Sequence, residues 1–251
     1  MSSIIIAFVV FGCVFGGALL GILFRRMLPT HHLSSDSKDT VKLGMGLVGT
    51  MAALVLGLLV ASAKGSYDAQ SAELTQMSAN VAVLDRLLAL YGPESREART
   101  QLRAIATRVL DQLWSRDGAG PTSSAPTSSA GERLYATIQE LSPKNDMQRS
   151  LQSQALGIGM EIGKTRWLMF EQATTSISLP LLIILVLWLT AIFISFGLFA
   201  PFNSTVILSL LVSALAVSGA VLLILEMYAP YQGLIQISKA PLRAAIAQLG
   251  H

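Results

Sequence analysis

Charged side chains are scarce in this sequence of 251 residues. Asp, Glu, Lys and Arg make up 13% of it, whereas hydrophobic residues make up 52%. That charged share is about half of what soluble domains carry. A soluble globule of this size needs more polar surface, so the composition argues against a soluble enzyme. The net charge of +3 is too small an excess for a nucleic-acid-binding protein.

Residues and motifs that carry catalytic or metal chemistry are also few. The single cysteine, Cys13, excludes an intramolecular disulfide and a thiolate metal cluster. The three histidines are His31, His32 and His251, and two adjacent histidines cannot share one helix face. No serine lies in a Gly-x-Ser-x-Gly frame, and the glycines at 44 and 46 lie in an apolar run, where they serve packing. We therefore expect no enzyme, no bound metal and no cofactor.

Four apolar runs are each long enough to cross a membrane as a helix, which takes about 20 residues. They cover residues 4–24, 43–63, 179–199 and 206–225. The first run can also be read as a cleaved signal peptide. No Lys or Arg precedes it, however, and it is about twice as long as the core of a signal peptide. We interpret it as a span, with cleavage as the alternative.

The sequence thus predicts an all-α integral membrane protein with four transmembrane helices and a helical extramembrane insert. Residues 1–63 and 177–227 form two transmembrane hairpins, and residues 64–176 form the insert between the second and third spans. Residues 228–251 form a turn and a short amphipathic helix. Basic residues near the span ends are almost equally numerous on the two sides, so the charge-bias rule leaves the orientation open.

Within the insert, apolar residues recur at helical spacing. Gly92 and Pro93 predict the end of one helix and the start of the next. Residues 115–131 lack large apolar side chains and are typical of a flexible linker. Ser142 and Pro143 predict the start of a last long helix. The first insert helix has an apolar seam with alternating steps of three and four residues: Leu74, Met77, Val81, Leu84, Leu88 and Tyr91. Each helix has a single apolar stripe, so it must pack against other helices.

Small residues in the spans are the main candidates for function. Gly46, Thr50, Ala53 and Gly57 share one stripe of the second span. Small residues four apart let helices approach closely in lipid, and two interpretations stay open. The stripe packs inside the bundle of one chain, or it lines a pore at the centre of an oligomer.

Two other spans carry comparable stripes. The first span has glycine pairs at 12 and 16 and at 17 and 21, which suit helix contacts. The fourth has Ser209 and Ser213, whose hydroxyls either line a hydrated path or bond to carbonyls of their own helix.

Glu226 is an acidic residue at the end of an apolar run. A carboxylate inside a membrane is costly and suggests function, but at a helix end solvation at the interface is an equally good account. Pro230, Gly233 and Pro241 follow it and predict a turn and a helix over residues 242–249. We expect this tail to fold back against the membrane or the insert.

Three stretches of the sequence resemble the bacterial bestrophin-like domain family, a group of four-span inner-membrane proteins. They are HHLSSDSKDTVKLGMGLVGTMAALVLGLLVASAKGSYD, LSPKNDMQRSLQSQA with TRWLMFEQ, and SFGLFAPFNSTV with LILEMYAPYQGLIQISKAPLRAAIAQLG. The resemblance covers almost the whole chain and weakens only at residues 115–131.

The family name rests on a remote similarity to bestrophins, pentameric anion channels whose second span lines the pore and whose helical insert is cytoplasmic. The resemblance therefore implies a homo-oligomeric, anion-conducting channel in the bacterial inner membrane, with lipid and inorganic ions as partners. Two features depart from that pattern. Bestrophin pores narrow at bulky apolar residues, whereas the second span here offers mostly Gly, Ala, Leu and Val, and the acidic cluster that binds calcium in animal bestrophins is not seen.

The alternative is a membrane sensor or a structural scaffold that uses the helical insert to bind a partner. A periplasmic insert would favour sensing, and a cytoplasmic one favours the bestrophin-like interpretation.

Overall fold

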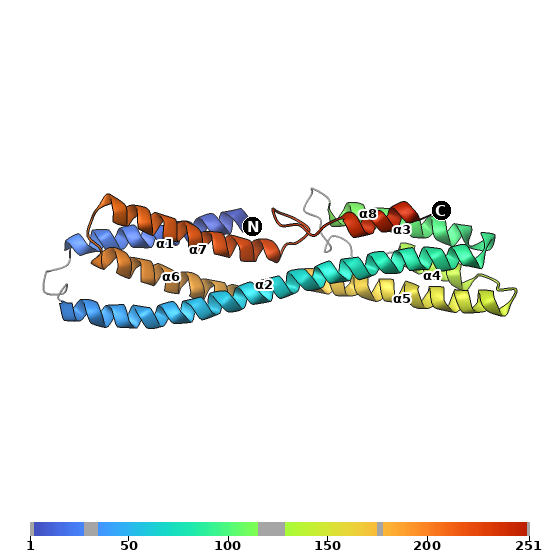
Figure 1. The fold of residues 1–251 in the computed structure, drawn as a ribbon, viewed down its shortest axis with the longest axis horizontal. Helices are drawn as coiled ribbons and strands as arrows, with labels where there is room; N and C mark the ends of the chain where they lie inside the picture. Colours follow the sequence, from blue (N-terminus) through green and yellow to red (C-terminus); the bar gives the residue numbers. More distant parts are fainter. Residues whose placement is uncertain (1–2, 28–34, 115–128, 175–177, 250–251) are drawn as a thin grey trace. The chain divides into compact units, whose positions relative to one another are not determined.

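All regular secondary structure is helical in the part that the computed structural model describes, which comprises residues 3–27, 35–114, 129–174 and 178–249 (Figure 1). No strand occurs in these four ranges. The all-α prediction is confirmed. In chain order the elements are α1 (Ser3–Met27), α2 (Ser35–Tyr91), the 3-10 helix η2 (Pro93–Ser95), α3 (Arg96–Leu113), α4 (Ser129–Gln139), α5 (Asp146–Thr174), α6 (Leu179–Phe199), α7 (Ser204–Met227) and α8 (Ala240–Gln248).

Four of these helices, α1, α2, α6 and α7, are long and apolar enough to cross a membrane. They contain the four predicted spans. α2 is much longer than its span, with 57 residues, because no proline interrupts it between the apolar run and the insert. α7 begins two residues earlier than predicted, since Asn203 Oδ1 accepts a hydrogen bond from the backbone N–H of Val206 at 2.8 Å and caps the helix.

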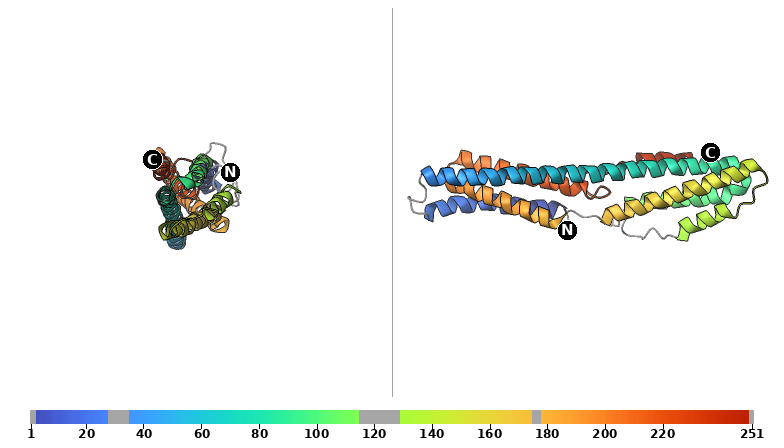
Figure 2. Two further views of the ribbon diagram at one scale, coloured as in Figure 1. Left: turned by 90° about the vertical axis from the view of Figure 1, so that its right-hand side faces the viewer. Right: turned by 90° about the horizontal axis from the view of Figure 1, so that it is seen from below.

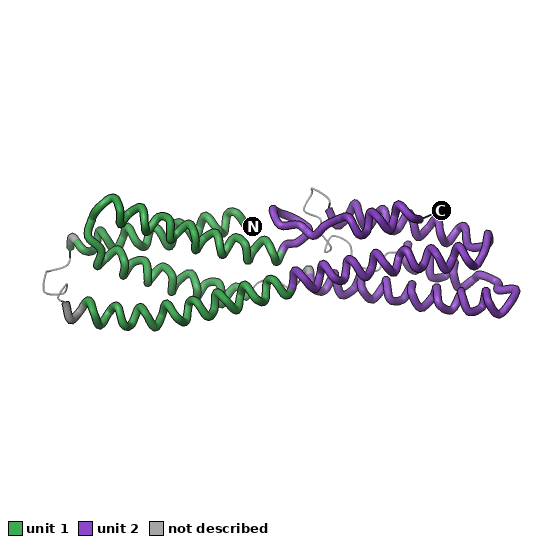
Figure 3. The backbone as a smooth tube through the Cα atoms, viewed as in Figure 1, with its two compact units in different colours: residues 1–65, 176–228 green, residues 66–175, 229–251 purple. Residues whose placement is uncertain are grey.

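The chain divides into two compact units (Figure 3). Unit 1 comprises residues 1–65 and 176–228, and unit 2 comprises residues 66–175 and 229–251. These boundaries lie within two residues of the composition changes at 64 and 176. The C-terminal residues belong to the same unit as the insert, because Tyr231, Ile237 and Leu242 are buried in an apolar cluster with Leu74 and Met77 of α2.

In unit 1, α1 and α6 lie side by side at very short distance (Figure 2). A Cβ atom built on Gly21 would collide with the carbonyl oxygen of Ile194, and one built on Gly197 would collide with the carbonyl oxygen of Ala18. Backbone therefore touches backbone at this crossing, which only glycine allows.

The two glycine pairs of α1 differ in role. A Cβ on Gly17 would lie 3.0 Å from Cγ2 of Thr190, so Gly17 and Gly21 both face α6. A Cβ on Gly12 or Gly16 would meet nothing within 4 Å. Of the two expected contacts, only the second is made within the chain.

In unit 2, the apolar seam of α2 forms the core. Its six residues between positions 74 and 91 are between 0% and 4% exposed. Three of them, Val81, Leu84 and Leu88, pack against the apolar faces of α3, α4 and α5, where the buried side chains include Ala98, Leu102, Leu134, Ile138 and Ala155. The period of three and four therefore identified the buried face of this helix correctly.

Two helix starts differ from the prediction. α4 begins at Ser129, so the last three residues expected in the linker are helical, while residues 115–128 lie outside the described ranges. α5 begins at Asp146, and its N-cap is Asn145, whose side chain accepts the N–H of Gln148 at 2.8 Å. The side-chain Oε1 of Gln148 in turn accepts a hydrogen bond from the backbone N–H of Lys144 at 2.7 Å, an arrangement close to a capping box.

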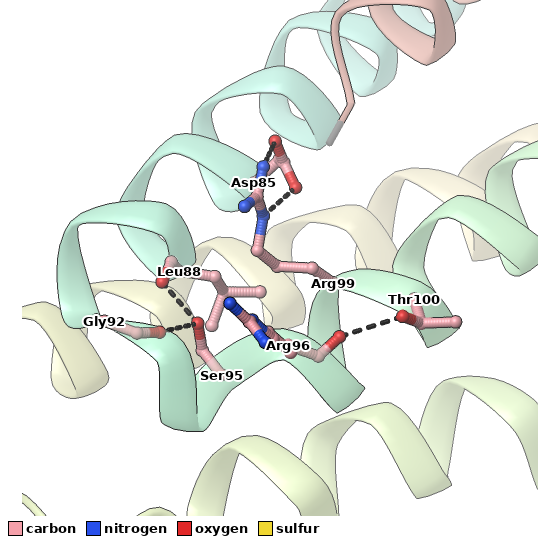
Figure 4. A network of polar contacts seen from close by, with 7 residues as sticks. All are labelled: Asp85, Leu88, Gly92, Ser95, Arg96, Arg99 and Thr100. Atoms are coloured by element: carbon pink, nitrogen blue, oxygen red, sulfur yellow. Dashed lines mark hydrogen bonds and ion pairs between the residues drawn. The ribbon is translucent and has the colours of Figure 1, made fainter. Parts of the chain in front are cut away.

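The turn between α2 and α3 depends on Gly92 (Figure 4). Its φ is 124° and its ψ is −173°, a region that is essentially restricted to glycine. Ser95, which is fully buried, donates its hydroxyl toward the carbonyl oxygens of Leu88 at 2.5 Å and Gly92 at 2.8 Å. These bonds satisfy carbonyls at the end of α2.

We expect Gly92→Ala to lower the stability of the protein by about 2 kcal/mol, because any Cβ makes this backbone conformation strained. The measurement is the unfolding midpoint of the purified protein in detergent. Gly157→Ala in α5 is the matched control, since a Cβ there meets nothing within 4 Å. Equal midpoints for the two variants would contradict the argument.

Candidate functional site

The membrane-length part of α2 is the least buried of the four spans. In its most apolar stretch 11% of the residues are buried, compared with 33% in α1 and 28% in each of α6 and α7. Its buried side is narrow: Ala52, Leu59 and Ala63 belong to the apolar core of unit 1. Most of this span therefore presents its side chains away from its own chain.

The four predicted pore-lining residues share one exposed face. Gly46, Thr50, Ala53 and Gly57 are all exposed, and a Cβ on Gly46 or Gly57 would meet nothing within 4 Å. These four residues are therefore not packed against other helices of unit 1 in the described part of the chain. The hydroxyl of Thr50 donates to the carbonyl oxygen of Leu47 at 2.7 Å, which leaves its lone pairs directed outward.

A second exposed face of α2 carries large apolar side chains. Leu43, Leu47, Leu54 and Leu58 are between 62% and 78% exposed. On a helix of 3.6 residues per turn, this face lies about a quarter turn from the small-residue face. One helix thus has a face of small side chains beside a face of leucines.

Charged residues stand at both ends of the small-residue face. Asp39 precedes Gly46 by seven residues and Lys64 follows Gly57 by seven residues, so that each continues the same stripe. Asp39 forms an exposed ion pair with Lys42 at 3.6 Å. Between these ends the four residues present only apolar groups, backbone and one hydroxyl.

Two of the serines predicted to form the stripe of α7 are exposed as well. Ser209, Ser213 and Ala216 face away from the rest of their chain. α7 thus has a small-residue face like that of α2.

Glu226 is buried, with 4% of its surface exposed. In the single chain, the carboxyl group of Glu226 is therefore shielded from water and is not solvated at a membrane interface. The segment after Glu226 contains a turn: Gly233 has a φ of 99°, and the N–H of Ile237 donates to the carbonyl oxygen of Pro230 at 2.8 Å. Pro230 is buried.

The histidines His31, His32 and His251 lie outside the described residues. Within the described ranges, no group of three or more His, Cys, Asp or Glu side chains is arranged to hold a metal ion. Cys13 is exposed on α1 and is a free thiol.

Sequence reasoning missed one buried ion pair in unit 2. Arg99 Nε and Nη2 donate to the two carboxylate oxygens of Asp85 at 2.8 and 2.9 Å (Figure 4). The side chains are 8% exposed for Asp85 and 21% for Arg99. The hydrogen bonds to Asp85 raise the pKa of Arg99. The signal was an acidic residue within the apolar seam, directly after Leu84.

Sequence reasoning also missed a partly buried polar cluster in unit 2. It consists of Gln70 and Glu73 of α2, Gln172 of α5 and Tyr231 of the segment after α7. Gln172 Nε2 donates to Glu73 Oε1 at 2.5 Å. Burial and the neighbouring Glu73 carboxylate raise the pKa of Tyr231.

Known proteins resemble this chain in sequence pattern and in fold. The model of the bestrophin-like domain family matches residues 12–242. A crystal structure of a bacterial bestrophin homologue from Klebsiella pneumoniae carrying one point mutation superposes with a TM-score of 0.65 at 15% identity, covering 94% of this chain and 97% of the other. A second point mutant gives 0.66 at 16% identity with the same coverage. No curated protein matches the chain.

Proposed function

Because the chain belongs to the bestrophin-like domain family, we propose that it is a homo-oligomeric ion channel of the bacterial inner membrane, with α2 lining the pore and anions as the conducted ions. Lipid, further copies of the chain and inorganic ions are its partners. The insert lies in the cytoplasm, and the protein is not an enzyme.

The observation that carries this proposal is the exposed small-residue face of α2. In lipid, an exposed run of Gly, Thr and Ala gains little from contact with acyl chains, because it offers little apolar surface. The adjacent leucine face suits lipid or a neighbouring subunit. An arrangement in which several copies direct Gly46, Thr50, Ala53 and Gly57 toward a common axis accounts for both faces at once.

The chemistry of this face suits ion passage better than ion binding. It has no ionisable side chain between Lys42 and Lys64, so an ion passing along it meets no fixed charge strong enough to trap it.

Cysteine accessibility tests the orientation of α2. In a background with Cys13 replaced by serine, cysteines at positions 46, 50, 53 and 57 are expected to react with a small charged thiol reagent in membranes, and cysteines at 54 and 58 are expected to stay protected. Thiolates form only where water reaches. Leu54 and Leu58 are 70% and 62% exposed in the single chain. A difference in cysteine reactivity between the two faces must therefore arise from contacts with other subunits or with lipid.

Ion flux into liposomes tests conduction. Gly57→Leu is expected to block chloride flux while preserving the oligomer, because the side chain enters the pore. If the stripe is instead a contact between helices of different subunits, cysteines on it will be inert and Gly57→Leu will break the assembly. That pattern would refute the pore-lining role.

A further inference from the structure

The polar cluster of Gln70, Glu73, Gln172 and Tyr231 lies wholly within unit 2. Gln70 precedes Glu73 by three residues, so the two side chains are neighbours on one face of α2. Gln172 is held to Glu73 by the hydrogen bond of 2.5 Å. Tyr231 is buried in the apolar cluster that contains Leu74, the residue directly after Glu73. The raised pKa of Tyr231, caused in part by Glu73, agrees with a hydroxyl that lies near the carboxylate.

All four residues have a buried oxygen that lacks a hydrogen-bond partner among the described residues: Gln70 Oε1, Glu73 Oε2, Gln172 Oε1 and Tyr231 Oη. Gln70 and Tyr231 are only 1% and 4% exposed. More than about 90% of buried polar groups in native proteins are paired. Four unpaired oxygens in one cluster therefore need a physical explanation.

The cluster has an excess of acceptors. An amide oxygen and an ionised carboxylate oxygen only accept hydrogen bonds, so three of the four oxygens are acceptors and the hydroxyl of Tyr231 is the one donor among them. A single hydroxyl cannot satisfy three acceptors. A bound positive charge can satisfy all of them at once.

We propose that Gln70, Glu73, Gln172 and Tyr231 bind a monovalent metal cation, Na⁺ or K⁺. Carboxylate, carbonyl and hydroxyl oxygens are the ligands that hard cations prefer. Glu73 supplies one negative charge, which balances one positive charge, whereas a divalent ion would leave a net charge in a partly buried site. The site joins α2 and α5 to the segment after α7, and it does not depend on ion conduction.

A proton is the competing explanation. If Glu73 is protonated, its Oε2 becomes a donor and pairs with one of the neighbouring acceptors. Stability would then depend on pH and not on the alkali cation. The two explanations therefore predict different salt responses.

The test is the unfolding midpoint of the full-length protein in detergent, followed by tryptophan fluorescence. The ring of Trp114 contacts that of Tyr231 edge-on at 5.6 Å, so one reporter lies beside the site. Sodium chloride, potassium chloride and N-methyl-glucamine chloride are compared at equal ionic strength and at several pH values. Chloride is thereby constant, and any effect of the conducted anion is common to all samples.

We expect a saturable rise of the midpoint in sodium or in potassium relative to N-methyl-glucamine, because a ligand that binds only the folded state stabilises it. Whichever of the two salts gives the larger rise identifies the ion. Glu73→Gln is expected to abolish the difference between salts. Glu94→Gln, which changes an exposed carboxylate of the same unit, is expected to keep it.

Equal midpoints in the three salts at every pH would overturn the proposal, as would a salt response that Glu73→Gln retains. If Glu73→Gln fails to fold, sodium and potassium NMR relaxation on the unaltered protein decides. Excess relaxation of either ion over protein-free micelles that another alkali cation competes away supports the site, and the absence of excess relaxation for both ions refutes it.

Discussion

Gly21→Ala is expected to destabilise the protein by about 3 kcal/mol, at the upper end of what one added methyl group costs in a packed core. The new Cβ would collide with the carbonyl oxygen of Ile194, which is backbone of α6 and cannot rotate aside. α1 and α6 would have to separate, and the contacts on both sides of the crossing would weaken. Gly197→Ala should have a similar effect, because its new Cβ on α6 would collide with the backbone of α1 at the same helix crossing.

Gly12→Ala is the matched control on α1. A Cβ at this position meets nothing within 4 Å, and alanine favours a helix over glycine by up to about 1 kcal/mol. The two substitutions are chemically identical and are expected to have opposite signs. Unfolding midpoints and gel filtration in detergent measure both. A Gly21→Ala variant as stable as Gly12→Ala would show that the crossing is looser than the structure has it.

Asp85→Ala is expected to cost about 3 kcal/mol, because it leaves the guanidinium of Arg99 largely buried without its partner. The expected loss of stability lies at the lower end of the range for broken buried ion pairs, because the Arg99 side chain is 21% exposed and keeps some of its hydration. Denaturation of the full-length protein measures the loss.

Two further variants separate the loss of charge pairing from the loss of packing. Replacing Asp85 and Arg99 together by leucine is expected to restore most of the stability, because a buried ion pair contributes little more than apolar residues of similar volume. Glu94→Ala removes an exposed ion pair with Lys144, and it should cost far less than Asp85→Ala because water screens this pair. A double variant as unstable as Asp85→Ala would mean that the pair is needed for its geometry.

The sequence was sufficient to predict what periodicity and composition encode. Four apolar runs gave the spans, and the steps of three and four gave the buried seam of α2 within its 57 residues. The dipeptide Gly92-Pro93 marked the turn, because the backbone there needs the φ of 124° that glycine tolerates. These are local properties of the chain.

The start of α5 was predictable but was assigned to the wrong residues. Ser142-Pro143 and Asn145 are both plausible N-caps. The decisive signal was Gln148, three residues after Asn145, which completes the reciprocal bonds of the cap. Met147 lies in the first turn of the helix and is 65% exposed.

Pairings between distant residues were beyond sequence reasoning. Asp85 is an acidic residue beside an apolar seam, but its pairing with Arg99 instead of Arg96 depends on the geometry of the α2–α3 hairpin. Tyr231 is separated from Glu73 by two membrane-length helices in the chain, and no local pattern links them. For the same reason, the exposure of the small-residue face of α2 could be known only once the packing of α1, α6 and α7 was known.

Unit 2 is assembled from two chain segments that are separated by the hairpin of α6 and α7. During translation, the insert therefore leaves the ribosome long before Tyr231, Ile237 and Leu242, which complete its core. The apolar faces of α2 and α5 stay partly uncovered until both later helices have entered the bilayer. The order of synthesis thus couples the completion of the extramembrane unit to successful insertion of the second hairpin, and a chain whose hairpin fails to insert presents an unfinished core that quality-control proteases can recognise.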